Sequence, residues 1–157
     1  MKVKEIMTQP VITITEDTPL QEVARIMLER RIGGLPVINQ SGELTGMVTE
    51  SDFVAKEKCV PFSMFRAPQL FGTWLGNDAE QIYASAMNIP VREIMSTSVV
   101  TVTGDEPIEK VLELILMHDI NRIPVIKDGK PVGIVARHDL LRLMKARSTF
   151  SSSEASS

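Results

Sequence analysis

Cysteine, histidine and aromatic residues are scarce in this chain. Its one cysteine, Cys59, excludes an internal disulfide and fits a reducing compartment. Because Cys59 has no neighbours at metal-ligand spacing and there are only two histidines, no pattern typical of a metal centre or of nucleophilic catalysis is present. There is also no Gly-x-Gly-x-x-Gly sequence and no P-loop lysine. The sequence therefore favours a protein that is not an enzyme.

Long apolar runs and a strong charge of either sign are also absent. No run approaches the roughly 20 residues that span a bilayer, and the first residues do not resemble a signal peptide, so we expect a cytoplasmic protein without a membrane partner. The net charge of −3 and the pI near 5.4 argue against nucleic-acid binding. One basic cluster on the last predicted helix is typical of a solvated helix end and comprises Arg137, His138, Arg142, Lys145 and Arg147.

What the chain does contain is an internal repeat. Residues 3–53 align with residues 91–140 through a single gap, and the matching residues recur in the same order. The matches include Glu5–Met7 with Glu93–Met95, Pro36–Ile38 with Pro124–Ile126, Gly46 with Gly133, and Asp52 with Asp139. A copy of only about 50 residues buries little apolar surface alone. We therefore expect the copies to share a core and to be related by a pseudo-two-fold axis.

Each copy predicts the element order β-α-β-β-α, so the expected fold class is α/β (α+β). A first strand is indicated by β-branched residues over 11–15 and 99–103. The sequence Thr18-Pro19-Leu20-Gln21 has the pattern of a capping box at a helix start. The following helices place apolar residues on one face, namely Leu20, Val23, Ala24 and Met27 in the first copy and Ile108, Val111, Leu112 and Ile115 in the second.

Two further strands and a second helix complete each copy. The strands are expected to form a hairpin because turn residues separate two apolar runs. The runs are 35–38 and 44–48 around Ser41-Gly42, and 123–126 and 131–135 around Asp128-Gly129. The second helix is expected to open near Asp52 in one copy and near Asp139 in the other.

The repeats also set the expected domain boundaries. We expect the first repeat over 1–56, an aromatic-rich insert over 57–90, the second repeat over 91–147 and a disordered Ser-rich tail over 148–157. A segment that only connects two halves would be polar, and this insert is not. It is therefore expected to pack within the chain or in a homodimer, with an apolar surface for another partner as the alternative.

One phrase recurs where the last strand of each copy meets the last helix. It reads Gly46-x-x-Thr49-x-x-Asp52 in the first copy and Gly133-x-x-Ala136-x-x-Asp139 in the second. The glycine lets the backbone approach another group, and free N–H groups near Thr49 would suit a phosphate. Asp52 can accept hydrogen bonds from adjacent hydroxyls, as on a ribose. A structural role stays open, with Thr49 as an N-cap and Asp52 as a favourable charge at a helix start.

Together with the Ile-Met-Thr start and the Pro-Val-Ile strand, this phrase resembles the motifs of a tandem pair of CBS domains, often called a Bateman module. The resemblance covers both repeats but neither the insert nor the tail. It implies a regulatory module that binds an adenosine-containing ligand, such as AMP, ADP, ATP or S-adenosylmethionine, in clefts between the repeats. A homodimer is also implied, and any regulated activity is expected on an effector protein. Whether magnesium accompanies the ligand is left open.

The resemblance further implies which residues form two clefts. In one cleft Asp52 would hold the ribose and Thr49 the phosphate; in the other Asp139 would hold the ribose, with Arg122 near a phosphate. The base pockets would be lined by Met95, Val100, Ile120 and Asn121 in the first cleft and by Met7, Ile12, Ile32, Gly33 and Gly34 in the second.

Two departures from the family pattern predict that the clefts are not equivalent. Ala136 stands where the family has Ser or Thr, which removes a hydroxyl. Gly33-Gly34 stands where the second copy has Asn121-Arg122, so the first copy offers no arginine there. The alternative to a ligand sensor is a ligand-independent dimerisation or interaction scaffold that acts through its aromatic insert.

Overall fold

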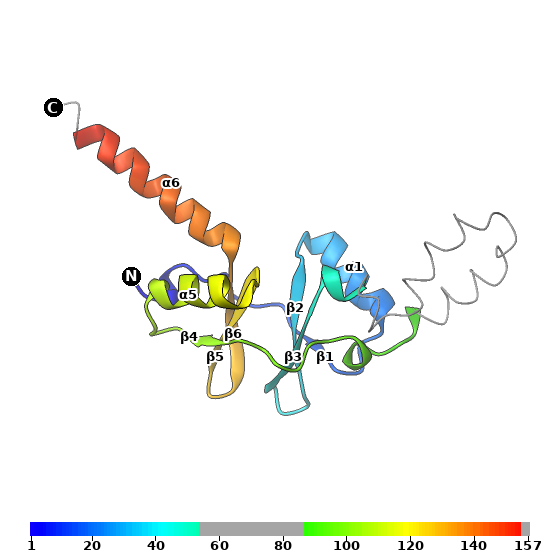
Figure 1. Ribbon diagram of the computed structural model, residues 1–157. Helices are drawn as coiled ribbons and strands as arrows, with labels where there is room; N and C mark the ends of the chain where they lie inside the picture. Colours follow the sequence, from blue (N-terminus) through cyan, green and yellow to red (C-terminus); the bar gives the residue numbers. More distant parts are fainter. Residues whose placement is uncertain (54–86, 155–157) are drawn as a thin grey trace, which may run out of the picture. The chain divides into compact units, whose positions relative to one another are not determined.

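The chain forms two compact units in the computed structural model, which describes residues 1–53 and 87–154 and the side chains as far as residue 145 (Figure 1). Unit 1 comprises Met1–Val11 and Val100–Ser157, and unit 2 comprises Ile12–Val99. Each unit therefore combines most of one repeat with the opening residues of the other. Most of the predicted insert, including Cys59 and its aromatic residues, lies outside the described residues.

Unit 2 contains a three-stranded sheet in the order β1-β2-β3. The pairing of β1 with β2 is parallel, with α1 as the crossover, and the pairing of β2 with β3 is antiparallel. The elements of the unit are β1 (Ile14–Thr15), α1 (Leu20–Arg30), β2 (Gly34–Ile38), β3 (Leu44–Thr49) and the 3-10 helices η2 (Glu50–Phe53) and η4 (Val91–Glu93).

Unit 1 repeats this plan with a sheet in the order β4-β5-β6 (Figure 1). Again the first pair of strands is parallel and the second antiparallel. Its elements are η1 (Val3–Glu5), β4 (Val102–Thr103), α5 (Ile108–His118), β5 (Arg122–Lys127), β6 (Lys130–Ala136) and α6 (Arg137–Glu154). The predicted mixed α/β class is confirmed, as is the order β-α-β-β-α in the second copy.

The hairpins lie where the turn residues predict them. Gly42 and Gly129 have φ angles of 80° and 77°, and Asp128 has a φ of 52°. This left-handed conformation is open to glycine and tolerated by aspartate. The turns fix the register in which β2 pairs with β3 and β5 with β6, and thereby place the strand ends that carry the recurring phrase.

Each core combines residues from both repeats. Val91 and Ile94, at 0% and 1% exposure, pack into the core of unit 2 against α1 and its sheet. Val3, at 0% exposure, occupies the corresponding place in the core of unit 1. Complete burial of an aliphatic side chain of this size is worth about 1.5–3 kcal/mol. The opening residues of each repeat are therefore part of the core of the unit that holds the other repeat's sheet.

Two local predictions were wrong. The Thr18 hydroxyl accepts a hydrogen bond from the Thr15 N–H at 3.2 Å, and the N-cap of α1 is Pro19, which has no side-chain cap. Because Thr18 lies one residue too early, the capping box does not form. Leu112 is 44% exposed, since the buried face of α5 consists of Ile108, Val111 and Ile115.

The helix α6 continues to Glu154, through most of the serine-rich stretch for which the composition predicted disorder. The first strands are shorter than predicted, since β1 begins only at Ile14 and β4 at Val102. In the described part of the chain, no helix combines the length and the apolar character that a membrane span requires.

Candidate functional site

The recurring phrase of the first copy forms a tight corner where β3 meets η2. The Thr49 N–H donates a hydrogen bond to Oδ2 of Asp52 at 2.8 Å, and the hydroxyls of Thr49 and Ser51 lie 2.8 Å apart. Asp52 is only 9% exposed. A side chain that reaches back three residues to a backbone N–H is half of a capping box. One carboxylate oxygen therefore holds the corner, while Oδ1 has no hydrogen-bond partner among the described residues.

The start of β2 forms the opposite wall of this corner. The Glu50 N–H donates to the Gly33 carbonyl at 3.1 Å, and Gly34 pairs in register with Thr49. Ile32, one residue earlier, packs partly buried against the core of the same unit. The residues predicted around Gly33-Gly34 and the residues of the phrase are thus neighbours within unit 2.

The corner of unit 1 has the same backbone geometry. The Ala136 N–H donates to Oδ2 of Asp139 at 2.8 Å, and the Arg137 N–H donates to the Asn121 carbonyl at 2.8 Å. Arg122 pairs in register with Ala136, as Gly34 does with Thr49. The two corners therefore share one scaffold but present different side chains.

The side-chain charges of the unit 1 corner are partly paired. Oδ1 of Asp139 lies 4.0 Å from Nη1 of Arg142, and the Asp139 side chain is 13% exposed. Nη2 of Arg137 donates to the Ile120 carbonyl at 3.2 Å and lies 3.8 Å from a carboxylate oxygen of Asp119. These contacts fix Arg137 against the loop that precedes β5.

The glycine of the phrase faces a methionine in both units. Met95 lies against Gly46, and Met7 lies against Gly133. Met95 is partly buried against the core that contains β3, and Met7 against the core that contains β6. The close approach that the glycine permits is therefore to a methionine of the same unit, which comes from the opening segment of the other repeat.

The predicted ligand-binding residues divide between the units. Unit 2 contains Ile12, Ile32, Gly33, Gly34, Thr49, Asp52 and Met95, and unit 1 contains Met7, Val100, Ile120, Asn121, Arg122 and Asp139. Of the set implied for the first cleft, Thr49, Asp52 and Met95 share a unit. Ile12 and Val100 precede β1 and β4, apart from the two corners in sequence.

Some residues of the corners were not assigned by sequence reasoning. Ser51 contacts the Thr49 hydroxyl, and Glu50 and Arg137 tie their corners to β2 and β5 through backbone hydrogen bonds. Their position inside the recurring phrase is the sequence feature that could have identified them. Within residues 1–53 and 87–154, no group of three or more His, Cys, Asp or Glu side chains could hold a metal ion.

Comparison with known proteins identifies the repeats. The sequence profile of the CBS domain matches residues 3–57 and 91–146. The CBS domain-containing protein YhcV of Bacillus subtilis is 31% identical over 138 residues, which cover 88% of this chain and 81% of YhcV. Several other curated relatives are much longer: this chain spans only 24% of the homoserine O-acetyltransferase of Methanohalobium evestigatum, to which it is 32% identical over 144 residues.

Solved structures share the fold. The CBS domain of a CBS domain-containing membrane protein from Sphaerobacter thermophilus has a TM-score of 0.73 and 36% identity, with 91% of this chain and 87% of that chain covered. The CBS domain pair of protein MJ0100, in complex with 5′-methylthioadenosine and S-adenosyl-L-methionine, has a TM-score of 0.70 and 26% identity, with 94% and 98% covered. With two matched segments and the same fold along nearly its whole length, this chain belongs to the CBS domain family as a tandem pair.

Proposed function

We propose that this chain is a non-catalytic regulatory module that binds an adenosine-containing ligand and signals to a partner protein. The observation that carries the proposal is the similarity to the MJ0100 domain pair over 94% of this chain, because that pair was solved with 5′-methylthioadenosine and S-adenosyl-L-methionine. The two ligands have the adenosyl group in common. An adenosyl group is therefore the part of the ligand that we assign to this chain, with AMP, ADP, ATP and S-adenosylmethionine as candidates.

The corner geometry suits the ribose of such a ligand. Oδ2 of Asp52 is occupied by the Thr49 N–H, which leaves Oδ1 to accept from a ribose hydroxyl. Asp139 is held in the same way by the Ala136 N–H. Hydrogen bonds to a charged group are each worth about 1.5–3 kcal/mol. The structural role of these aspartates and a ligand role are thus compatible, because they use different oxygens.

We assign the remaining contacts to the base and the phosphate. Thr49 and Arg122 are the proposed phosphate contacts. The proposed base contacts are Met95, Val100, Ile120 and Asn121 with Asp52, and Met7, Ile12, Ile32, Gly33 and Gly34 with Asp139. Most of these side chains are apolar, as is typical of adenine pockets.

A regulatory role is favoured over a catalytic one by the chemistry of the corners. Among the described residues, neither His118 nor His138 is hydrogen-bonded to a carboxylate that would orient it as a general base. The single cysteine of the chain suits a reducing compartment, and we place the protein in the cytoplasm.

Thermal unfolding with a ligand panel tests the proposal. A ligand at 100 times its dissociation constant adds about 2.7 kcal/mol, which for a chain of this size raises Tm by very roughly 5–11 °C. The panel comprises AMP, ADP, ATP, S-adenosylmethionine and NAD, with GMP as the control for the base. A selective rise with an adenine ligand is expected. A flat panel for folded protein would contradict the proposal.

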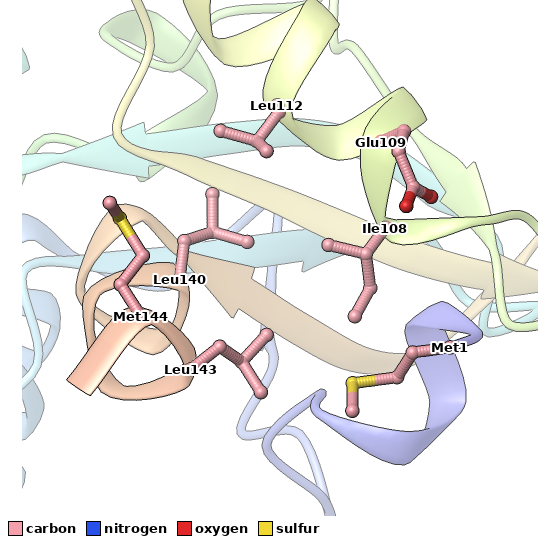
Figure 2. A pocket seen from close by; sticks show the side chains of 7 residues that line it. All are labelled: Met1, Ile108, Glu109, Leu112, Leu140, Leu143 and Met144. Atoms are coloured by element: carbon pink, nitrogen blue, oxygen red, sulfur yellow. The ribbon is translucent and has the colours of Figure 1, made fainter. Parts of the chain in front are cut away.

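A second candidate function, assembly of two copies, is favoured by an apolar groove in unit 1. A cavity of about 130 Å³ opens between the start of α5, the first two turns of α6 and Met1 (Figure 2). The side chains that line it are Met1, Ile108, Glu109, Leu112, Leu140, Leu143 and Met144. Further apolar residues on the same two helices are exposed, namely Leu116, Met117 and Leu141. We propose that a second copy covers this face in a homodimer, whether or not a ligand is bound.

A further inference from the structure

Methionines differ widely in exposure along this chain. Its nine methionines include Met64, which lies outside the described residues. The buried ones, with at most 8% exposure, are Met27, Met47 and Met87. The strongly exposed ones, with at least 58% exposure, are Met1, Met117 and Met144. Met7 and Met95 lie between these groups: each packs against the core of its unit, while part of the residue stays accessible to solvent.

The sulfurs of these two methionines occupy equivalent places. The Met95 sulfur is the nearest heavy atom to the position that a β-carbon of Gly46 would fill, and the Met7 sulfur is the nearest to the same position at Gly133. These are the glycines that open the recurring phrase of each corner. Met7 and Met95 thus combine partial solvent access with direct contact to the strand that leads into a corner.

Backbone hydrogen bonds attach the next residue of each opening segment to the same strand. The Ser96 N–H donates to the Met47 carbonyl at 2.9 Å, and the Met47 N–H donates to the Ser96 carbonyl at 2.9 Å. In unit 1 the Thr8 N–H donates to the Ile134 carbonyl at 2.9 Å, and the Ile134 N–H donates to the Thr8 carbonyl at 3.2 Å. A change that displaces either methionine would therefore loosen the attachment of its segment to β3 or β6.

Oxidation of a methionine by hydrogen peroxide is such a change. The thioether sulfur attacks one peroxide oxygen, so that an S–O bond forms as the O–O bond breaks. The sulfur is oxidised to a sulfoxide, and the other oxygen leaves with both peroxide protons as water. The product is polar and larger than the thioether, whereas the sulfur packs closely against a glycine backbone. Because burial of a polar sulfoxide without a hydrogen-bond donor is unfavourable, we expect the oxidised side chain to leave this contact.

We propose that Met7 and Met95 are a pair of oxidation-sensitive modification sites, at which peroxide forms the sulfoxide and releases the opening segment from the glycine of the phrase. Oxidation of the exposed methionines has no such effect, because most of each of those residues already lies in solvent. The effect on stability does not depend on the proposed function. The effect on ligand affinity rests on it, since both methionines are among the proposed base contacts.

Peroxide treatment of the full chain with and without the two sulfurs tests the inference. The variant Met7→Leu/Met95→Leu keeps apolar side chains of similar size, which peroxide does not oxidise. Met117→Leu/Met144→Leu is the matched control, since it removes two sulfurs from exposed positions. Each protein is compared with its own untreated form, so that the cost of the substitution itself cancels. Cys59, which peroxide also oxidises, is present in all three proteins.

Peptide mass spectrometry should show sulfoxide at Met7 and Met95 of the treated wild type. The Tm of wild type and of the control should then fall by roughly 2–10 °C, as for an overpacked contact, whereas Met7→Leu/Met95→Leu should keep its Tm. Methionine sulfoxide reductases with dithiothreitol should restore the Tm of wild type. Dithiothreitol alone should not restore it, which separates methionine oxidation from oxidation of the cysteine.

The inference is wrong if Met7 and Met95 stay unoxidised while Met117 and Met144 react. It is also wrong if the Tm falls equally in all three proteins, or if oxidised wild type keeps its Tm. Calorimetric titration with 5′-methylthioadenosine before and after treatment separates the inference from the proposed function. A lower affinity only in the proteins that lose Tm supports both. Protein that binds no adenosine compound before treatment contradicts the proposed function, and the Tm comparison still decides the inference.

Discussion

A β-carbon added to Gly46 would lie 2.6 Å from the sulfur of Met95, and the same distance separates the corresponding position of Gly133 from the sulfur of Met7. Carbon atoms of folded proteins do not approach sulfur so closely. Each glycine thus leaves room for a methionine that belongs to the other repeat. In unit 2 the residues next to this contact are joined by backbone hydrogen bonds: the Met47 N–H donates to the Ser96 carbonyl, and the Ser96 N–H donates to the Met47 carbonyl.

Substitution of Gly46 by alanine should therefore destabilise the protein. We expect a loss of about 1–3 kcal/mol in the free energy of unfolding, because Met95 or the Ser96 carbonyl must move to admit the methyl group. Urea denaturation of Gly46→Ala measures the loss. The double variant with Met95→Ala should recover part of it, as contacting residues couple in a double-mutant cycle.

Gly104 provides the control. A β-carbon there would meet only the Cβ of Lys4, at 3.3 Å. Gly104→Ala should cost clearly less than Gly46→Ala. Equal losses for the two variants would contradict the steric reason, because they would reflect a general effect of replacing glycine.

In the aspartates of the two corners, one carboxylate oxygen should contribute to stability and the other to ligand binding. Asp52→Ala removes the acceptor for the Thr49 N–H and should cost about 0.5–2 kcal/mol of stability. Asp52→Asn keeps an oxygen for that N–H and should cost less, while it still weakens binding of an adenosine ligand. Denaturation and titration of both variants separate the roles. If Asp52→Asn binds adenosine ligands like wild type, the ribose role of Asp52 is wrong.

The contacts of Lys2 and Lys4 with Asp105 should stabilise unit 1 in a pH-dependent way. A hydrogen bond from Lys4, then its charge and that of Lys2, hold the pKa of the fully exposed Asp105 below its ordinary value. A carboxylate with a lowered pKa adds stability above its unfolded-state pKa, and this stability is lost as the pH falls through the folded-state pKa. Wild type should exceed Asp105→Asn in stability near neutral pH, and the difference should vanish in strong acid. High salt should also reduce it.

The exposed apolar face of unit 1 should determine the oligomeric state. Leu116 on α5 is 76% exposed, and Leu28 on α1 of unit 2 occupies the matching position at 79% exposure. Leu116→Glu should shift the mass measured by light scattering from dimer to monomer, because a charge cannot be buried without a partner. Leu28→Glu should leave the mass unchanged. A dimer that survives Leu116→Glu would show that other residues mediate assembly.

Much of the fold follows from local sequence signals. Gly42 and Gly129 specify their turns because few other residues adopt a positive φ, and the apolar spacing of Leu20, Val23 and Met27 specifies the buried face of α1. The capping box predicted at Thr18 was wrong because the helix begins one residue later than expected, and the Thr18 hydroxyl accepts from the Thr15 N–H instead. The prediction that Leu112 lies on the buried face of α5 was wrong because its side chain borders a groove rather than the core.

The packing of the opening segments does not follow from the local sequence, and only the resemblance to CBS domains implied Met95 with Asp52 and Met7 with Asp139. Met7 and Met95 follow the same residues and meet the same glycine phrase, so either could pack on either copy as far as local sequence is concerned. The structure places Lys4 beside Asp105 and Arg92 beside Asp17, which crosses the repeats in both directions. The similarity of the two repeats indicates the fold, but it does not indicate which sheet each opening segment packs against.

This crossed packing makes each end of a repeat dependent on a distant part of the chain. Removal of residues 1–11 would take from unit 1 the Val3 side chain and the backbone hydrogen bonds from Val3 to Glu106 and from Lys4 to Gly104, leaving unit 2 with all of its own residues. Loss of the amino-terminal residues would therefore destabilise the unit that contains the carboxyl-terminal part of the chain. For the same reason residues 1–56 alone would lack Val91, Ile94 and Met95, so we expect the isolated first repeat to be less stable than the full chain.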